Sequence, residues 1–364
     1  MKFKSDRLLA DLRLQRRAII DRYSRPSNLH GLAQTLTTLA PLAALWWGIV
    51  QGTQVSYALT AAGVVVMAFL LLRAFVLMHE CGHASLYRSA WLNRACGFVF
   101  GVISGMPAYV WSQHHAFHHS TNGDWEKYRG PLNIIALDDY RAMNVTQQRR
   151  YRQARAIWLA PFGGFMYLIV MPRYNWVRGT VLFVRHLIRG LLARPRIPLK
   201  LHMRGFQSPY WSSAREYWHM FANNGVLILL WGAMAWLVGP LLFALCYVVS
   251  LSLAGGAGIM LFTVQHNFEK SYASASAGWD YHTAVLEGTS FLKLPRWLNW
   301  FTANIGYHHI HHLSARIPNY RLAACHDAHA HLFTGVTCMT LKEVPRTLRC
   351  ILWDRQARCI VAAG

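Results

Sequence analysis

Charged side chains are missing from two long stretches of this 364-residue sequence. Residues 31–72 and residues 217–268 contain no Asp, Glu, Lys or Arg. A helix that crosses the hydrocarbon core of a membrane needs roughly 20 mostly apolar residues, so each stretch is long enough for two crossings and a turn. Polar or helix-breaking residues at 51–54 and 238–240 mark the expected turns. A soluble protein with two buried helical hairpins is disfavoured by uncharged runs of this length.

We therefore predict an all-α integral membrane protein with four transmembrane helices in two hairpins, interfacial helices and a cytoplasmic, histidine-rich cap. No internal repeat or low-complexity segment divides the chain, so residues 1–364 are expected to form a single domain. The predicted spans cover about residues 33–50, 55–76, 220–238 and 241–264.

Acidic residues are scarce, and the placement of the basic ones predicts an orientation. The chain has 37 Lys and Arg against 15 Asp and Glu, a formal net charge of +22. Such a charge alone could suggest a nucleic-acid-binding protein. However, residues 1–30 carry eight basic residues and residues 173–215 carry nine, whereas the two expected turns carry none. Basic loops stay on the cytoplasmic side of a membrane. We predict no nucleic-acid partner and a multi-pass protein of the cell (inner) membrane, with both termini cytoplasmic. The cytoplasmic regions are then residues 1–30, 77–217 and 266–364.

Other absences fit this reading. Residues 1–30 contain no apolar stretch of the kind that a secretory signal requires. The seven cysteines include no CxxC pair, which favours free thiols in a reducing cytoplasm. The shorter apolar segments 95–110 and 156–172 contain Gly and Pro, and we expect both to lie in the membrane interface. In the basic segment that follows, the arginines at 178, 185 and 189 share one face of a helix, which is either solvated or docked on the membrane.

Histidine, by contrast, is abundant, with 19 copies in three clusters and isolated positions. One cluster has the pattern HxxxH, and two have the pattern HxxHH. These spacings place the rings on one face of a helix, where several can reach one metal ion. An even number of predicted crossings separates the clusters, so all eight rings lie on one side of the membrane. Neutral imidazole suits iron, copper, zinc and nickel. Because eight ligands exceed the needs of one ion, we expect a pair of metal ions. The residues are His79 and His83, then His115, His118 and His119, then His308, His311 and His312.

Around these clusters the sequence resembles the membrane fatty acid desaturase family, particularly the bacterial acyl-lipid type. The resemblance is carried in order by "HECGH", "HHAFHHSTNGD", "VQHNFE", "WDYHTAVLEGTSF" and "NWFTANIGYHHIHHLSARIPNYRL". It implies that the histidines bind two iron ions, that O2 is a co-substrate, and that one further histidine completes the ligands. His266 matches that position, and His282 is the alternative. Some relatives have an Asn one helical turn earlier, where this chain has Phe262, and Asn304 is considered as its substitute.

The implied activity is O2-dependent insertion of a double bond into a long acyl chain linked to a membrane lipid. A saturated methylene group has no acidic proton, so general acid–base catalysis cannot remove its hydrogen, and a metal-based oxidant is needed. The sequence has no glycine-rich dinucleotide fingerprint and no fused haem or iron–sulfur motif, which indicates an external electron donor. The basic surface suits an acidic ferredoxin or flavodoxin.

Two other functions share part of this pattern. A di-iron membrane hydroxylase or carotenoid oxygenase would use the same histidines. A histidine-rich metal transporter would place ligands within its spans, whereas the two uncharged stretches contain only His219 and His266, both near their ends.

Overall fold

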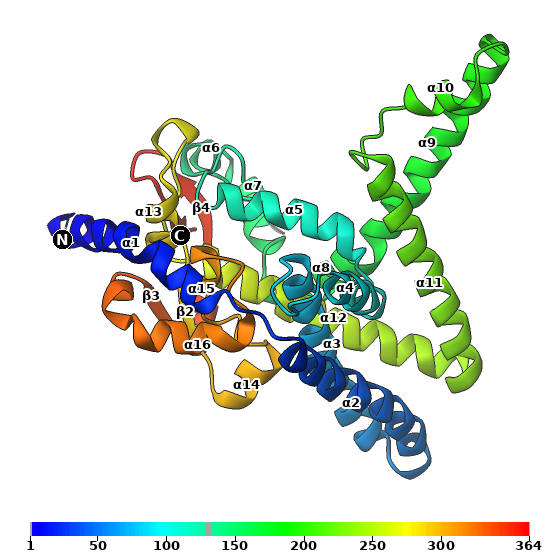
Figure 1. The fold of residues 1–364 in the computed structure, drawn as a ribbon, viewed down its shortest axis with the longest axis horizontal. Helices are drawn as coiled ribbons and strands as arrows, with labels where there is room; N and C mark the ends of the chain where they lie inside the picture. The colour runs from blue at the N-terminus through cyan, green and yellow to red at the C-terminus, as the bar shows by residue number, and fades with distance from the viewer. Residues whose placement is uncertain (1, 129–132, 364) are drawn as a thin grey trace.

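Four long apolar helices form the centre of the molecule in this computed structural model, which describes residues 2–128 and 133–363 (Figure 1). All four are long and apolar enough to cross a membrane, and two further bent helix pairs pass the same test when each pair is counted as one span. The prediction of an all-α membrane protein with four spans is therefore confirmed. The spanning helices are α2 (Asn28–Val55), α3 (Tyr57–Gly82), α11 (Ala214–Val238) and α12 (Pro240–His266).

The first hairpin turns later than the sequence predicted. Residues 51–54 remain helical, and only Ser56 separates α2 from α3. The Ser56 hydroxyl accepts a hydrogen bond from the Ala58 N–H at 3.2 Å and so caps α3, while the Ser56 N–H donates to the Gly52 carbonyl and closes α2. The predicted turn between α11 and α12 is correct, since Gly239 alone separates them with a φ of +92°, a conformation that favours glycine.

Both shorter apolar segments form bent helical structures. The first becomes α4 (Ala90–Ser104) and α5 (Ala108–Thr121), which meet at an angle of 99°. Gly105 permits this bend with a φ of +76°. The second segment packs on α12 through glycines, since a Cβ atom added to Gly164 would lie 2.2 Å from the carbonyl carbon of Gly255. Its elements are the 3-10 turn η1 (Ile157–Leu159), α8 (Ala160–Phe165) and the π-helical turn η2 (Met166–Val170).

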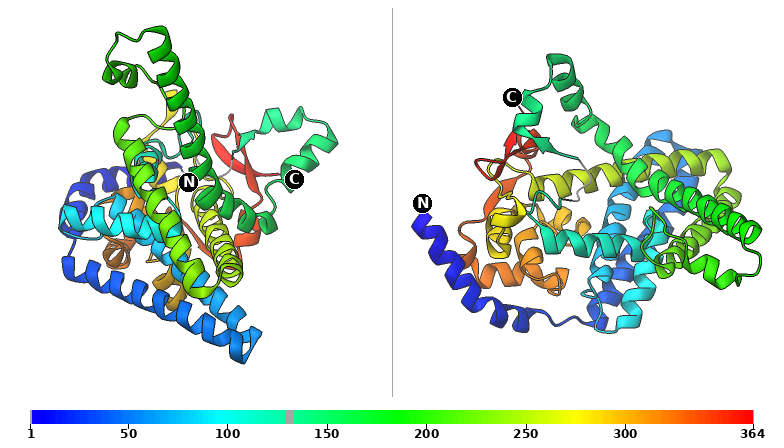
Figure 2. Two further views of the ribbon diagram at one scale, coloured as in Figure 1. Left: turned by 90° about the vertical axis from the view of Figure 1, so that its right-hand side faces the viewer. Right: turned by 90° about the horizontal axis from the view of Figure 1, so that it is seen from above.

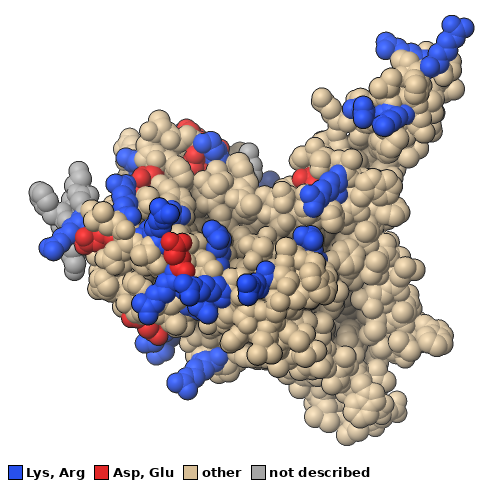
Figure 3. All heavy atoms as spheres, viewed as in Figure 1, with Lys and Arg blue, Asp and Glu red and all other residues tan. Residues whose placement is uncertain are grey.

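A helical arm continues from η2 and leads back into the third span. It is built from α9 (Met171–Ala193) and α10 (Leu199–Arg204), and it projects from the body in Figures 1 and 2. The predicted helix carrying the three arginines is therefore present as α9. Figure 3 shows Lys and Arg along this arm and around α1, whereas the ends of the two hairpins at the lower right show none.

The remaining elements form a cap at the end of the spans where α3 and α12 finish. Helix α1 (Lys2–Tyr23) covers it, with Leu12 and Ile19 buried against Ile310 and Leu322. Two small sheets, which the sequence analysis did not anticipate, complete the cap. The strands are β1 (Ile135–Ala136), β2 (Ser290–Lys293), β3 (Thr337–Thr340), β4 (Cys350–Asp354) and β5 (Cys359–Ala362). Strands β2 and β3 pair in parallel, and β4 lies between β1 and β5. The other helices are α6 (Leu137–Arg141), α7 (Val145–Gln153), η3 (Ser276–Gly278), α13 (Tyr281–Glu287), α14 (Arg296–Phe301), α15 (His308–Leu313), α16 (Asn319–Ala328), η4 (Ala330–Phe333) and α17 (Val344–Thr347).

A buried arginine in α3 ties the cap to the spans. The Arg73 guanidinium donates to the Thr38 hydroxyl at 2.9 Å and to the Trp300 carbonyl, and it lies 4.0 Å from the centre of the Trp300 indole ring. Because an unpaired buried charge is costly, these contacts hold α14 in place against α2 and α3.

Candidate metal centre

The four chain segments that carry the predicted ligands meet where α3 and α12 end. His79 lies in the last turns of α3, and His83 follows Gly82 as its C-cap. A Cβ atom at Gly82 would lie 2.9 Å from the Cβ of Ser112, so the glycine allows α3 and α5 to approach closely. The second cluster lies on α5, the third makes up most of α15, and His266 is the last residue of α12.

The histidine side chains form two adjacent groups, each able to hold a metal ion. Within each group the potential ligand nitrogens all lie within 4.8 Å of one another. His308 adjoins the second group, because its Nε2 atom lies 2.8 Å from the Nε2 atom of His266. The first group contains His79, His83, His115, His119 and His311. The second contains His118, His266 and His312.

Each HxxHH cluster is divided between the two groups. On α5, His118 belongs to the second group and its neighbour His119 to the first. On α15, His312 belongs to the second group and its neighbour His311 to the first. The His119 and His312 rings stack at a centroid distance of 4.2 Å, which places the groups side by side. Adjacent histidines on a helix point about 100° apart, so one HxxHH helix can serve two neighbouring ions.

The spacing of the nitrogens fits bound metal ions. The Nε2 atoms of His118 and His266 are 3.1 Å apart, as are those of His115 and His119, and those of His119 and His311 are 3.0 Å apart. A metal–nitrogen bond of about 2.1 Å puts ligands at right angles about 3 Å apart. Several other buried ring nitrogens have no hydrogen-bond partner among the described residues. They include His83 Nε2 and His312 Nε2.

Burial keeps the imidazoles neutral, which is the form that binds metals. Desolvation, followed by the neighbouring histidines, lowers the pKa of His308, His311 and His312 well below the usual range. The same effects lower the pKa of His118 to about 3. These rings therefore present free lone pairs at neutral pH.

The Nδ1 atoms of His266 and His79 each contact an oxygen atom that orients the imidazole ring. His266 Nδ1 lies 3.3 Å from the Gly288 carbonyl oxygen, and donation to it leaves Nε2 free to bind a metal. A carboxylate oxygen of Glu80 lies 3.2 Å from His79 Nδ1. Glu80 is fully buried, and its other oxygen accepts hydrogen bonds from the Ser85 hydroxyl and the Asn319 N–H. The sequence analysis did not assign Glu80 a role, although its position beside His79 in "HECGH" was a usable signal.

The alternatives considered for the ninth ligand are placed differently. His282 lies on α13 outside both groups, whereas His266 lies within the second. The Asn304 side chain donates to the Asn319 carbonyl at 3.2 Å. Phe262 packs on His118 and His266, with centroid distances of 5.0 and 4.9 Å, and so covers the second group on the side of the spans.

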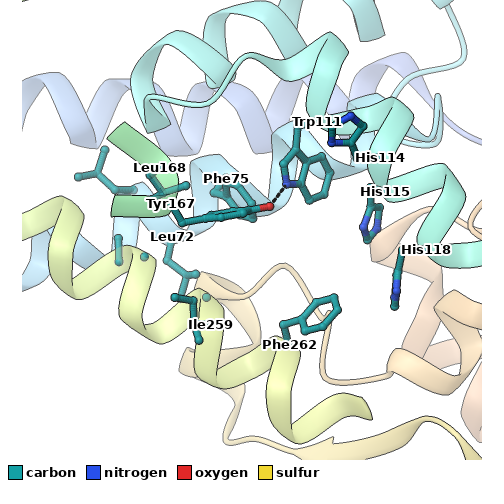
Figure 4. A pocket seen from close by; sticks show the side chains of 14 residues that line it. Leu72, Phe75, Trp111, His114, His115, His118, Tyr167, Leu168, Ile259 and Phe262 are labelled. Carbon is teal, nitrogen blue, oxygen red and sulfur yellow. Dashed lines mark hydrogen bonds between the residues drawn. The ribbon is translucent and has the colours of Figure 1, made fainter. Parts of the chain in front are cut away.

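An apolar cavity of about 270 Å³ adjoins His115 and His118 (Figure 4). Side chains from α3, α5, η2 and α12 line it, including Leu72, Phe75 and Ile259. The Trp111 indole N–H donates to the Tyr167 hydroxyl at 2.9 Å, and the Trp111 ring stacks on His115 at 4.4 Å. The cavity, which we call the proximal cavity, therefore runs from the histidines into the membrane-spanning region. The sequence analysis did not predict its lining.

The fold and the site together define an α-helical membrane protein in which two histidine groups suited to metal ions adjoin an apolar cavity. The chain belongs to the fatty acid desaturase family, whose family model, "Fatty acid desaturase", matches residues 54–338. It is 31% identical to "Fatty acid desaturase" of Bacillus subtilis (strain 168), across 93% of this chain and 88% of that protein.

More distant relatives carry more specific names. The chain is 26% identical to "sn-1 oleoyl-lipid 12-desaturase" of Picosynechococcus sp., across 68% of this chain and 62% of that protein. It is 24% identical to "Acyl-lipid (8-3)-desaturase" of Thraustochytrium sp., across 83% of this chain and 63% of that protein. The predicted function is thus confirmed at the level of a fatty acid desaturase, an oxidoreductase, and the histidine cluster fits a di-iron site.

Proposed function

We propose that this desaturase inserts a double bond into a long acyl chain of a membrane lipid, using O2 and two iron ions. The first ion would be held by the five histidines of the first group, and the second by His118, His266, His308 and His312. The observation that carries this proposal is the convergence of nine imidazoles from four segments directly beside an apolar cavity. The relatives named for acyl-lipid and oleoyl-lipid substrates support a lipid-linked chain.

The reaction must be balanced by a reductant. Conversion of a CH2–CH2 unit and O2 into a CH=CH unit and two water molecules consumes two electrons and two protons. Bound iron would supply the activation of O2 that removes hydrogen from an unactivated carbon. The protein would bind the chain, hold the ligand rings and exclude water. Each buried methylene group contributes about 0.8 kcal/mol, so the proximal cavity can hold a chain without polar recognition.

The electrons would come from an external donor that docks on α1. Arg17 is exposed on this helix, and Arg16 lies 5.0 Å from the centre of the Tyr281 ring. The Tyr281 hydroxyl donates to the carbonyl of His312 at 2.8 Å. The basic surface of α1 therefore lies one side chain away from a ligand of the second group. Its charge would attract a small acidic redox protein of the ferredoxin or flavodoxin type.

The orientation follows from the same charges. Both hairpin turns lie in uncharged stretches, whereas basic segments precede α2 and α11 at the histidine end. We infer that the cap, both termini and the metal centre face the cytoplasm across the inner membrane. A fluorescent reporter fused to the C-terminus should report a cytoplasmic location, and a periplasmic location would reverse the assignment.

Product analysis tests the proposed function. The iron-loaded protein in lipid vesicles, with O2 and a chemical reductant, should yield lipid chains that have lost two hydrogen atoms. Chains that have gained one oxygen atom would instead identify a hydroxylase. The His311→Ala variant removes a ligand of the first group and should form no product. It is the matched control that shows whether product formation depends on the metal centre.

A further inference from the structure

A second apolar cavity lies deeper among the spanning helices. It has a volume of about 370 Å³ and is lined by side chains of α2, α3, α4, α11 and α12, among them Trp46, Trp231 and Phe243. None of its lining residues carries a charge. We call it the distal cavity. Nothing in the chemistry of the metal centre itself requires a second hydrophobic cavity at this depth.

Leu71 lines both cavities and separates them. It is the one residue common to the two linings described above, and its side chain is only 5% exposed. On α3 it precedes His79 by eight residues, which is about 12 Å along a helix. The proximal cavity occupies this interval, beside His115 and His118.

The distal cavity continues away from the histidines beyond Leu71. Phe243 and Tyr247 of α12 line it, and Tyr247 precedes His266 by 19 residues, about 28 Å along the helix. On α2, which starts at the cap, Trp46 lies in the half nearer the hairpin turn. The two cavities therefore follow one another from the metal centre toward the far leaflet.

We propose that the distal cavity is a binding site for the methyl end of a long acyl chain, and that Leu71 is the barrier that such a chain must pass. This inference rests on the proposed function, because it assumes that the chain enters the proximal cavity from the histidine side. The occupant is identified by the uncharged, mainly apolar lining, by the residue that both cavities share and by the direction of the path. A chain that ends at Leu71 would fill only the proximal cavity, whereas a longer chain would extend into the distal one.

Three variants test this assignment by comparing a long with a short acyl chain of the same lipid. Leu71→Ala joins the cavities and should raise the ratio of kcat/KM for the long chain to that for the short chain by about fifteenfold, the contribution of two buried methylene groups. Ala43 is exposed on α2 and lines the distal cavity but not the proximal one, so Ala43→Phe places an aromatic ring at the distal cavity alone. This variant should lower the ratio by a similar factor. Leu70→Ala is the matched control, because Leu70 is equally buried and lines neither cavity.

A purely structural effect would lower both rates together and leave the ratio unchanged. An unchanged ratio in both Leu71→Ala and Ala43→Phe, or an equal change in Leu70→Ala, would overturn the proposal. If a membrane lipid entered the distal cavity from the side instead, the ratio would also stay unchanged in both variants, because such a lipid would bind equally well whichever substrate is present. That outcome would likewise overturn the proposal.

A binding measurement keeps this test separate from the proposed function. A lipid with a photoreactive diazirine at the methyl end of its chain should label the part of α2 around Ala43, and Ala43→Phe should abolish that labelling. Labelling without any unsaturated product in the wild-type protein would reject the proposed reaction and retain the cavity assignment. Labelling confined to the proximal cavity would reject the distal site.

Discussion

The division of each HxxHH cluster predicts an unusual pattern of metal loss. The variant His118→Ala/His119→Ala removes two neighbours on α5 that belong to different groups. It leaves four candidate ligands in the first group and three in the second, counting His308. The variant His118→Ala/His312→Ala removes two ligands from the second group alone. That group then keeps only His266 and His308, and the first group keeps all five.

The two variants should therefore respond differently to a chelator. Loss of even an indirect metal contact weakens affinity by about 10–100-fold, and loss of a direct ligand should cost at least as much. In His118→Ala/His312→Ala, about one iron per chain should remain as resistant to the chelator as in the wild type. In His118→Ala/His119→Ala, both irons should be lost at chelator concentrations lowered by at least that factor.

Iron analysis at each chelator concentration makes the measurement, with His119→Ala/His311→Ala as the mirror control that spares the second group. One iron with wild-type resistance in His118→Ala/His119→Ala would refute the reasoning. That result would mean that adjacent histidines share one ion.

Three further outcomes are expected. Gly164→Ala should destabilise the protein by about 1–3 kcal/mol, because its Cβ would overlap the backbone of Gly255, and thermal unfolding in detergent should show the loss. Gly225→Ala is the control, because its Cβ meets nothing within 4 Å and should not destabilise the protein. Equal losses of stability in the two variants would contradict the packing argument. Tyr167→Phe removes the hydrogen bond to Trp111, worth about 0.5–1.5 kcal/mol, and should reduce turnover at unchanged iron content. The control Tyr174→Phe, at an exposed position, should leave turnover unchanged. An equal effect of both variants would show that this hydrogen bond does not contribute to turnover. Arg17→Glu should slow turnover with an acidic protein donor several-fold at low salt, but not turnover with a chemical reductant. Arg178→Glu on the arm should have little effect on either rate. Turnover rates that do not depend on salt concentration would exclude electrostatic attraction of the donor to α1.

The features that local sequence determines were predicted well. Absence of charge is sufficient to locate four spans, because burying an ionised side chain in hydrocarbon is costly. Gly239 marks the second turn because its φ is positive. The first turn was placed too early, since Gly52 fits within α2 against Thr60 and the Ser56 cap lies further on.

The parts that depend on distant contacts were not predictable in this way. The sequence places His118 and His119 on one helix, but the rotation of α5 against α12 and α15 decides that they belong to different groups. Strand β2 pairs with β3 more than forty residues later, and neither has a distinctive pattern of its own. Both cavities depend on how the spans pack, which periodicity alone does not reveal.

The most direct test of the central claim is to measure metal content and product on the same purified sample. The protein should contain about two irons per chain, and, given O2 and reductant, it should convert a saturated lipid chain to an unsaturated one in proportion to the iron present. Zinc at that stoichiometry, or a chain left saturated by fully iron-loaded protein, would contradict it.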